Sequence, residues 1–142
     1  MTLDYKNHPI FEAYNDYFRM GSDRIRVLSG PIKLEEYQMM ITDFSSIVFD
    51  FAYLERPVLY FVPDYEMFRA GVTHTYRELD QPLEEGFGVF TQTADELFEQ
   101  LKRLIENNFV PDPVYQKRMH DFFWNKGKEE DTLYQYLMKK KD

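Results

Sequence analysis

Hydrophobic residues along the chain form two kinds of pattern, short continuous runs and longer stretches with a three- to four-residue period. Continuous runs occupy 39–42 and 57–62, and the second contains five apolar residues in succession, Val58–Val62. A continuous rather than alternating run is typical of a parallel strand covered on both faces. A shorter apolar stretch at 24–28 and the pair Val89–Phe90 predict two further strands.

Apolar positions at helical spacing predict helices between and after these strands. The predicted helices are 9–20, 34–38, 45–54, 65–68, 93–107, 111–124 and 129–140. Asp64 is a candidate N-cap for the fourth of them, and Thr93 with Glu96 forms a capping box at the start of the fifth. Residues 71–88 carry a proline, glycines and several charges, which predicts a mostly irregular loop.

Strands that alternate with helices predict right-handed β-α-β units and therefore an α/β fold with a parallel, doubly wound sheet. We expect residues 1–110 to form this domain and 111–142 to form C-terminal helices that pack on it. In sheets of this kind, ligands bind outside the carboxyl ends of the strands. Candidate chemistry is therefore sought where a predicted strand ends.

Composition narrows the classes of function. The 142 residues correspond to one domain, and the absence of cysteine excludes disulfides, thiolate metal sites and cysteine nucleophiles. Lys and Arg number 17 against 25 Asp and Glu, so the net charge of -8 argues against a general nucleic-acid binder. The carboxylates lack metal-ligand spacing, and we expect no metal and no cofactor. The first twenty residues are charged and have no apolar core, which predicts no secretory signal.

The most informative segment is Thr42-Asp43-Phe44-Ser45-Ser46, where a predicted buried strand ends and a helix begins. The first turn of a helix has unpaired N–H groups that bind phosphate in many α/β proteins. Ser45 and Ser46 add hydroxyl donors, and Asp50 lies one turn further along the same face, where it can accept hydrogen bonds from a sugar or polyol. The alternative is an ordinary helix cap that binds nothing, and no glycine-rich nucleotide-binding fingerprint is present.

This segment, taken together with three that follow it, closely resembles one family. The three are Asp50-Phe51-Ala52, Arg56-Pro57-Val58-Leu59-Tyr60 and Pro63-Asp64. The combined pattern is similar to the carboxy-terminal part of the CDP-glycerol glycerophosphotransferases, the teichoic acid polymerases and primases, and covers roughly residues 5–105. The resemblance implies a GT-B architecture of two Rossmann-like domains, in which this chain corresponds to the half that binds the donor.

The resemblance also implies roles for individual residues. Thr42, Ser45, Ser46 and Asp50 are expected to line the pocket for CDP-glycerol or a related CDP-polyol. His8 is the candidate catalytic residue, because Lys6-Asn7-His8 stands where the family has an Arg-x-His pattern. The lysine keeps the positive charge but lacks the two-pronged donor geometry of arginine. The alternative for His8 is an exposed residue that precedes a helix.

Two other histidines, His74 and His120, lie outside any family motif and are predicted to be surface residues. The family's amino-terminal domain, with its acceptor site and a second histidine element, has no counterpart in the sequence. The polymer acceptor is therefore expected to bind through that missing domain, and the isolated chain is expected to be inactive. A truncated binding module without catalysis and a GT-B nucleotide-sugar glycosyltransferase domain remain open alternatives. The loop at 72–86 departs from the family pattern, so the resemblance does not determine which head group the donor carries.

The resemblance implies a cytoplasmic location at the inner face of the membrane, where enzymes of this family act. Asp121-Phe122-Phe123-Trp124 is either an anchor in the membrane interface or the packing face of a helix, and packing is the favoured interpretation. The terminal Lys139-Lys140-Lys141 run is interpreted as a solvated tail, because three lysines bind an anionic membrane only weakly.

Overall fold

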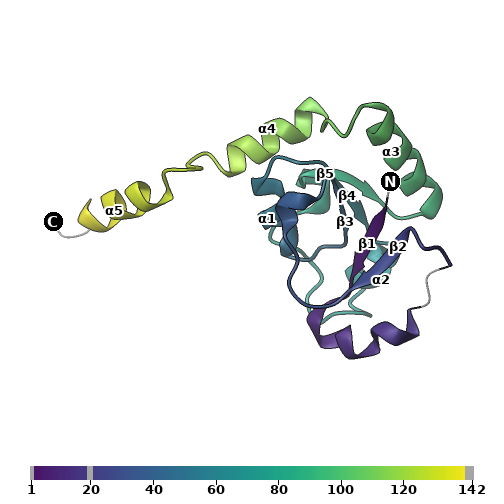
Figure 1. Ribbon diagram of the computed structural model, residues 1–142. Helices are drawn as coiled ribbons and strands as arrows, with labels where there is room; N and C mark the ends of the chain where they lie inside the picture. Colours follow the sequence, from purple (N-terminus) through teal and green to yellow (C-terminus); the bar gives the residue numbers. More distant parts are fainter. Residues whose placement is uncertain (1, 19–20, 140–142) are drawn as a thin grey trace. The chain divides into compact units, whose positions relative to one another are not determined.

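The computed structural model in Figure 1 describes residues 2–18 and 21–139. Its contacts divide the chain into two compact units, Met1–Lys33 and Leu34–Asp142. Each unit is built around a parallel sheet of its own. The α/β class and the parallel pairing are therefore as predicted, but the strands form two sheets rather than the single sheet that was expected. The division into 1–110 and 111–142 stays a prediction.

The first unit contains two parallel strands with a 3-10 helix between them. These elements are β1 (Leu3–Lys6), η1 (Pro9–Tyr17) and β2 (Ile25–Leu28). The strands pair in register from Leu3 with Ile25 to Lys6 with Leu28. The prediction of β2 is confirmed, whereas β1 was missed because two charged residues interrupt its short apolar pattern. The helix predicted at 9–20 ends at Tyr17, and residues 19–20 lie outside the described residues.

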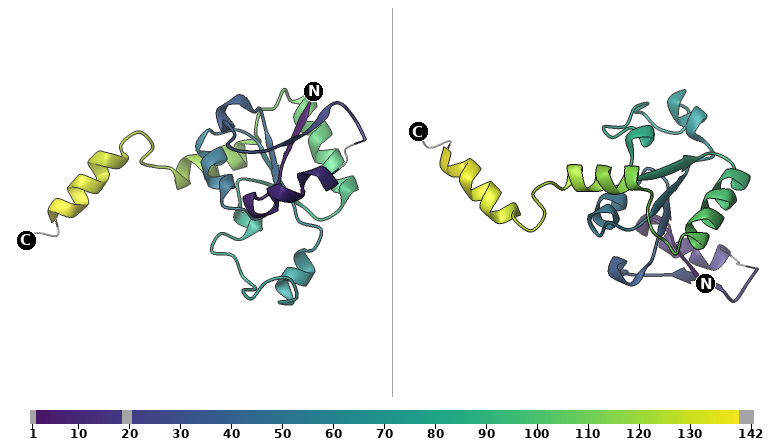
Figure 2. Two further views of the ribbon diagram at one scale, coloured as in Figure 1. Left: turned by 60° about the horizontal axis from the view of Figure 1, so that its bottom comes forward. Right: turned by 90° about the horizontal axis from the view of Figure 1, so that it is seen from above.

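The second unit is a three-stranded parallel sheet with helices on both sides. Its strands are β3 (Met40–Thr42), β4 (Val58–Phe61) and β5 (Gly88–Thr91), in that order across the sheet. Its helices are η2 (Leu34–Glu36), α1 (Ile47–Tyr53), α2 (Tyr65–Arg69), η3 (Leu83–Glu85), α3 (Ala94–Glu106), α4 (Pro113–Phe122) and α5 (Glu129–Lys139). Figures 1 and 2 show α1 and α3 on opposite sides of the sheet. All three strands of this sheet were predicted, and so was the helix between β3 and β4.

The core of this unit lies around the central strand. Val58, Leu59 and Tyr60 of β4 are all buried, as the continuous apolar run predicted for a strand covered on both faces. Phe51 of α1 and Phe68 of α2 are fully buried in the same cluster as Val58 and Tyr60. Each such side chain contributes about 1.5–3 kcal/mol through the apolar surface it removes from water. The core therefore fixes both helices that follow the carboxyl ends of β3 and β4.

The aromatic residues at the end of α4 follow the packing interpretation. Phe122 lies 5.5 Å from the ring of Phe49, and Phe123 lies 5.3 Å from the ring of Tyr53, measured between ring centroids. Trp124 is 72% exposed and therefore adds little to this packing. The apolar character of this segment is thus used mainly to attach α4 to α1.

The capping box predicted at the start of α3 is confirmed. The Thr93 hydroxyl accepts a hydrogen bond from the Glu96 N–H at 3.3 Å, and the Glu96 carboxylate accepts from the N–H groups of Gln92 and Thr93 at 2.9 and 3.2 Å. These backbone donors hold the pKa of Glu96 below its ordinary value of 4.5. Because the pKa is lowered by folding, the carboxylate's contribution to stability is complete above pH 4.5 and is lost as the pH falls through the folded-state pKa.

Replacing Glu96 by glutamine is expected to destabilise the protein at pH 7 and to have less effect near pH 3. The amide keeps the shape of the cap but loses the charge-assisted bonds, which the wild-type protein also loses once its carboxylate is protonated. Urea unfolding followed by circular dichroism at both pH values measures this. Glu99→Gln, on the same helix but outside the capping box, is the control. A difference between wild type and Glu96→Gln that does not change with pH would contradict the assignment.

Candidate functional site

The candidate site lies where β3 ends and α1 begins. Thr42 is the last residue of β3 and pairs with Tyr60, while Phe61 at the end of β4 pairs with Thr91 at the end of β5. Because the three strands are parallel, these residues mark one edge of the sheet, from which α1, α2 and α3 start. The sequence-predicted residues Thr42, Ser45, Ser46 and Asp50 all belong to this edge of the second unit.

The turn between β3 and α1 is held by hydrogen bonds of its own backbone. The Asp43 carboxylate accepts a hydrogen bond from the Ser45 N–H at 2.7 Å, which forms an Asx turn. The carbonyls of Ser45 and Ser46 accept from the N–H groups of Val48 and Phe49, both at 3.1 Å. The turn therefore has a defined shape before any ligand binds.

The structure leaves the two serine hydroxyls available. Ser46 occupies the N-cap position of α1, but its side chain makes no capping hydrogen bond. Within residues 2–18 and 21–139, neither serine hydroxyl has a protein partner, and the N–H groups of Ser46 and Ile47 find no protein acceptor. Ser45 is half-buried, whereas Ser46 and Asp50 are exposed. Four donors without a protein acceptor thus lie in one short turn.

The length of α1 determines which of its features can act on a ligand. The helix has only seven residues, so the dipole of its peptide groups is small. Binding at this turn therefore depends on local hydrogen bonds from hydroxyl and N–H groups rather than on the field of a long helix. Asp50 lies in the first turn of α1, and its carboxylate is an acceptor of hydrogen bonds beside the donors of the turn.

Phe44 attaches this turn to the body of the second unit. Its ring centroid lies 4.9 Å from that of Phe68 and 5.3 Å from that of His74. The prediction that His74 is a surface residue holds only in part, because it is half-buried among aromatic rings, while His120 is exposed as predicted. Sequence analysis missed this contact because His74 stands in a loop with no periodic pattern.

His8 belongs to the first unit, where it caps η1. Its Nδ1 accepts a hydrogen bond from the Ile10 N–H at 3.3 Å, and its own N–H donates to the Asn7 side chain at 3.1 Å. The imidazole is exposed, so its Nε2 is accessible to solvent. Lys6, expected to supply a charge beside His8, forms an ion pair with Glu12. The capping role of His8 leaves one ring nitrogen for other chemistry.

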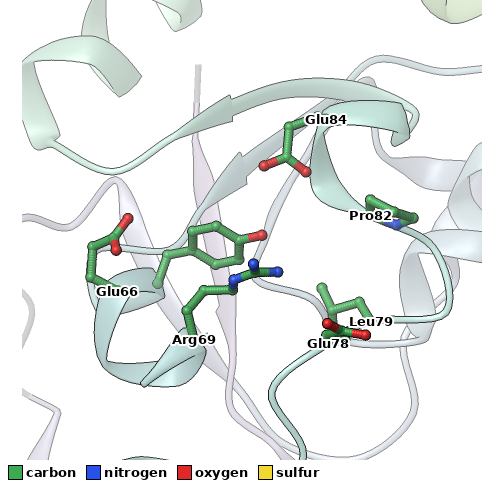
Figure 3. Close-up of a pocket in the computed structure, with 7 residues that line it drawn as sticks. Glu66, Arg69, Glu78, Leu79, Pro82 and Glu84 are labelled. Atoms are coloured by element: carbon green, nitrogen blue, oxygen red, sulfur yellow. The ribbon is translucent and has the colours of Figure 1, made fainter. Parts of the chain in front are cut away.

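A cleft of about 420 Å³ lies elsewhere in the second unit, between α2 and the loop that follows it. Figure 3 shows Arg69 and Glu84 directed toward the same space. Burial, followed by the charge of Glu84, raises the pKa of Tyr65 in its wall. The lining residues are Tyr65, Glu66, Arg69, Glu78, Leu79, Pro82 and Glu84. With three carboxylates and one guanidinium, this cleft disfavours a pyrophosphate, and it contains none of the predicted site residues.

Two further searches cover only the part of the chain that the structure describes. No group of three or more His, Asp or Glu side chains there is arranged to hold a metal ion. No helix there is long and apolar enough to cross a membrane.

Comparison with known protein families shows to which family the chain, including the turn between β3 and α1, belongs. Residues 2–139 match the family described as CDP-glycerol:poly(glycerophosphate) glycerophosphotransferase. The chain belongs to this family. The match covers both units, and therefore includes the β3–α1 turn as well as His8. The resemblance inferred from the sequence motifs is confirmed.

Individual curated proteins are also similar to this chain, over shorter stretches. The chain is 32% identical over 123 residues to the minor teichoic acid biosynthesis protein GgaB of Bacillus subtilis (strain 168), which covers 85% of this chain and 12% of GgaB. It is 39% identical over 66 residues to the teichoic acid poly(glycerol phosphate) polymerase of the same organism, covering 46% of this chain and 8% of that protein. No solved structure matches the chain. The chain thus spans about a tenth of the length of these curated relatives.

Proposed function

We propose that this chain is the part of a glycerophosphotransferase that binds the CDP-activated polyol-phosphate donor, in the synthesis of teichoic acid or a related cell-wall polymer. The second unit would then be the Rossmann-like, donor-binding half of a GT-B architecture. Family membership and the names of the relatives support the general function. They also support a polymer as the acceptor in general. That the acceptor group is a hydroxyl and that the reaction takes place at the cytoplasmic face of the membrane are parts of the same proposal.

The observation that carries this proposal is the set of available donors at the carboxyl edge of the parallel sheet. The hydroxyls of Ser45 and Ser46 and the N–H groups of Ser46 and Ile47 have no protein acceptor in the described part of the chain. Phosphate oxygens accept several hydrogen bonds at once, and preorganised donors bind them without reorganisation. The turn that carries the family motif is therefore suited to a pyrophosphate.

In the proposed reaction, the acceptor hydroxyl oxygen attacks the phosphorus that bears the polyol. The bond from this phosphorus to the bridging oxygen breaks, CMP leaves with the electron pair, and the acceptor proton passes to a base. Ser45 and Ser46 hold phosphate oxygens and stabilise the charge that develops on CMP. Thr42 lines the pocket at the strand end, and the Asp50 carboxylate accepts a hydrogen bond from a hydroxyl of the polyol or the ribose.

His8 is proposed separately as a catalytic residue that contacts phosphate or moves a proton. The accessible Nε2 of its imidazole supports this, because Nδ1 is already used to cap η1. Donor binding at the β3–α1 turn does not depend on this assignment.

Replacing both Ser45 and Ser46 by alanine is expected to weaken the binding of CDP-glycerol by about a hundredfold. Each hydroxyl gives one hydrogen bond to a charged oxygen, typically 1.5–3 kcal/mol, and roughly 1.4 kcal/mol corresponds to a tenfold change in affinity. The fold is expected to be retained, because the Ser46 side chain makes no capping bond. Titration calorimetry on folded protein measures the affinity.

The matched control is Thr132→Ala, which removes a hydroxyl from α5 and should leave the affinity unchanged. UDP-glucose is expected to bind more weakly than CDP-glycerol, and the reverse order would favour a nucleotide-sugar transferase. If the wild type and the folded double variant bind CDP-glycerol with equal affinity, the proposal that Ser45 and Ser46 bind the donor is wrong.

A further inference from the structure

We propose that His74 is a positioning residue of the candidate donor site, which acts through Phe44 to hold the Asp43–Ser46 turn in its binding shape. The proposal rests on the proposed function, since it assigns His74 to the same site. It concerns a loop histidine that lies outside the motifs of the family.

The path of the chain after α2 brings His74 to this place. Gly71 has a φ of +74°, and its N–H donates to the Phe68 carbonyl at 2.8 Å. The next N–H, of Val72, donates to the Met67 carbonyl at 2.9 Å. This pair of bonds is a Schellman motif, which ends a helix and reverses the direction of the chain. The direction in which the loop leaves α2 is therefore set by backbone hydrogen bonds.

His74 is fixed on several sides by other side chains. Its ring centroid lies 5.3 Å from Phe44, 5.6 Å from Phe68 and 5.3 Å from Tyr76, and the contacts with both phenylalanines are edge-to-face. Its Nδ1 lies 3.0 Å from the Thr73 hydroxyl, within hydrogen-bond distance. Edge-to-face aromatic contacts each contribute about 0.5–1.5 kcal/mol beyond the area they bury. The imidazole is thus a well-held member of the aromatic cluster Phe44, Phe68, His74 and Tyr76.

Phe44 transmits this restraint to the donor groups. Its neighbours in the sequence are Asp43, which accepts the Ser45 N–H, and Ser45 itself. If the Phe44 ring loses its neighbour, the backbone between these two residues gains freedom, and the hydroxyls of the turn are no longer preorganised. Hydrogen bonds that require exact placement are the first to weaken under such freedom. Deleting the His74 ring should therefore loosen the turn before it unfolds the sheet.

Amide hydrogen exchange on the full chain tests this directly. In His74→Ala, exchange at the hydrogen-bonded N–H groups of Ser45, Val48 and Phe49 should accelerate about tenfold, the equivalent of losing one or two aromatic contacts. Exchange at Leu59 in β4 should not change. His120→Ala, which removes an exposed histidine on α4, should leave the turn unaffected. His74→Leu, which refills part of the volume, should give a smaller acceleration and serves as the test variant if the alanine variant does not fold.

Unchanged exchange at the turn in folded His74→Ala or His74→Leu would overturn the proposal. Equal acceleration at the turn and in β4 would also overturn it, because the role of His74 would then be general stability. The affinity for CDP-glycerol should fall in His74→Ala and stay constant in His120→Ala. If the wild-type chain binds no CDP-glycerol, the proposed function fails, while the exchange result still decides whether His74 positions the turn.

Discussion

Gly88→Ala is expected to destabilise the protein by about 3 kcal/mol or more, the upper end of the range for overpacking in a core. Gly88 begins β5 and pairs with Val58 of the central strand. A Cβ at this position would lie 1.8 Å from the Val58 carbonyl oxygen and 2.6 Å from its carbonyl carbon. Both atoms are backbone, so neither can move without breaking the pairing of β4 with β5. A loss of this size is a large share of the stability of a typical domain.

Gly21→Ala provides the matched control for this substitution. Apart from Gly21 itself and its two chain neighbours, no residue has an atom within 4 Å of the position of its Cβ, so the added methyl group meets open space. Urea unfolding followed by circular dichroism should give a lower midpoint for Gly88→Ala and an unchanged one for Gly21→Ala. Equal midpoints for the two variants would show that the close approach of β5 to β4 is wrong.

Phe68→Ala is expected to destabilise the protein by about 3–5 kcal/mol, as large-to-small changes of a buried phenylalanine do. Phe68 is fully buried on α2, where its ring contacts those of Phe44, Tyr65, His74 and Tyr76. Its removal leaves a cavity between the core and Phe44, the residue that attaches the β3–α1 turn to the second unit. The effect should therefore include both lower stability and weaker binding of CDP-glycerol.

The neighbouring residue Met67 is the control for Phe68. Its side chain is 50% exposed on the same helix, and its truncation to alanine should change stability by less than about 0.5 kcal/mol. Thermal unfolding of both variants, compared with wild type, measures the difference. A destabilisation by Met67→Ala as large as that by Phe68→Ala would mean that α2 is turned differently on the core.

Features whose causes are local in the sequence were predicted well. The Val58–Val62 run indicates a covered strand because every position is apolar, and the structure buries most of them. The capping box of α3 could be predicted because Thr93 and Glu96 stand at the required spacing. The turn after β3 was placed correctly because a buried run ends there and small polar residues follow.

Features that depend on distant partners were not predicted. β1 has four residues, and only its pairing with β2, more than twenty residues later, makes it a strand. His74 has no periodic context, and two of its aromatic neighbours, Phe68 and Phe44, come from α2 and from the β3–α1 turn. The 3-10 geometry of η1 could not be separated from an α-helix, because its few apolar residues recur at three- and four-residue steps, which both helix types allow. The sequence also left open whether the Ser46 side chain is free or caps α1, because serine at an N-cap usually bonds the backbone.

The central claim is that a CDP-activated donor binds at the β3–α1 turn, and a nuclear magnetic resonance titration of the labelled chain with CDP-glycerol tests it most directly. The account predicts saturable shifts of the amides of Ser45, Ser46 and Ile47, with much weaker binding by inorganic phosphate alone. Saturable shifts confined to the cleft around Arg69 and Glu84, or no saturable shift in a folded protein, would contradict it.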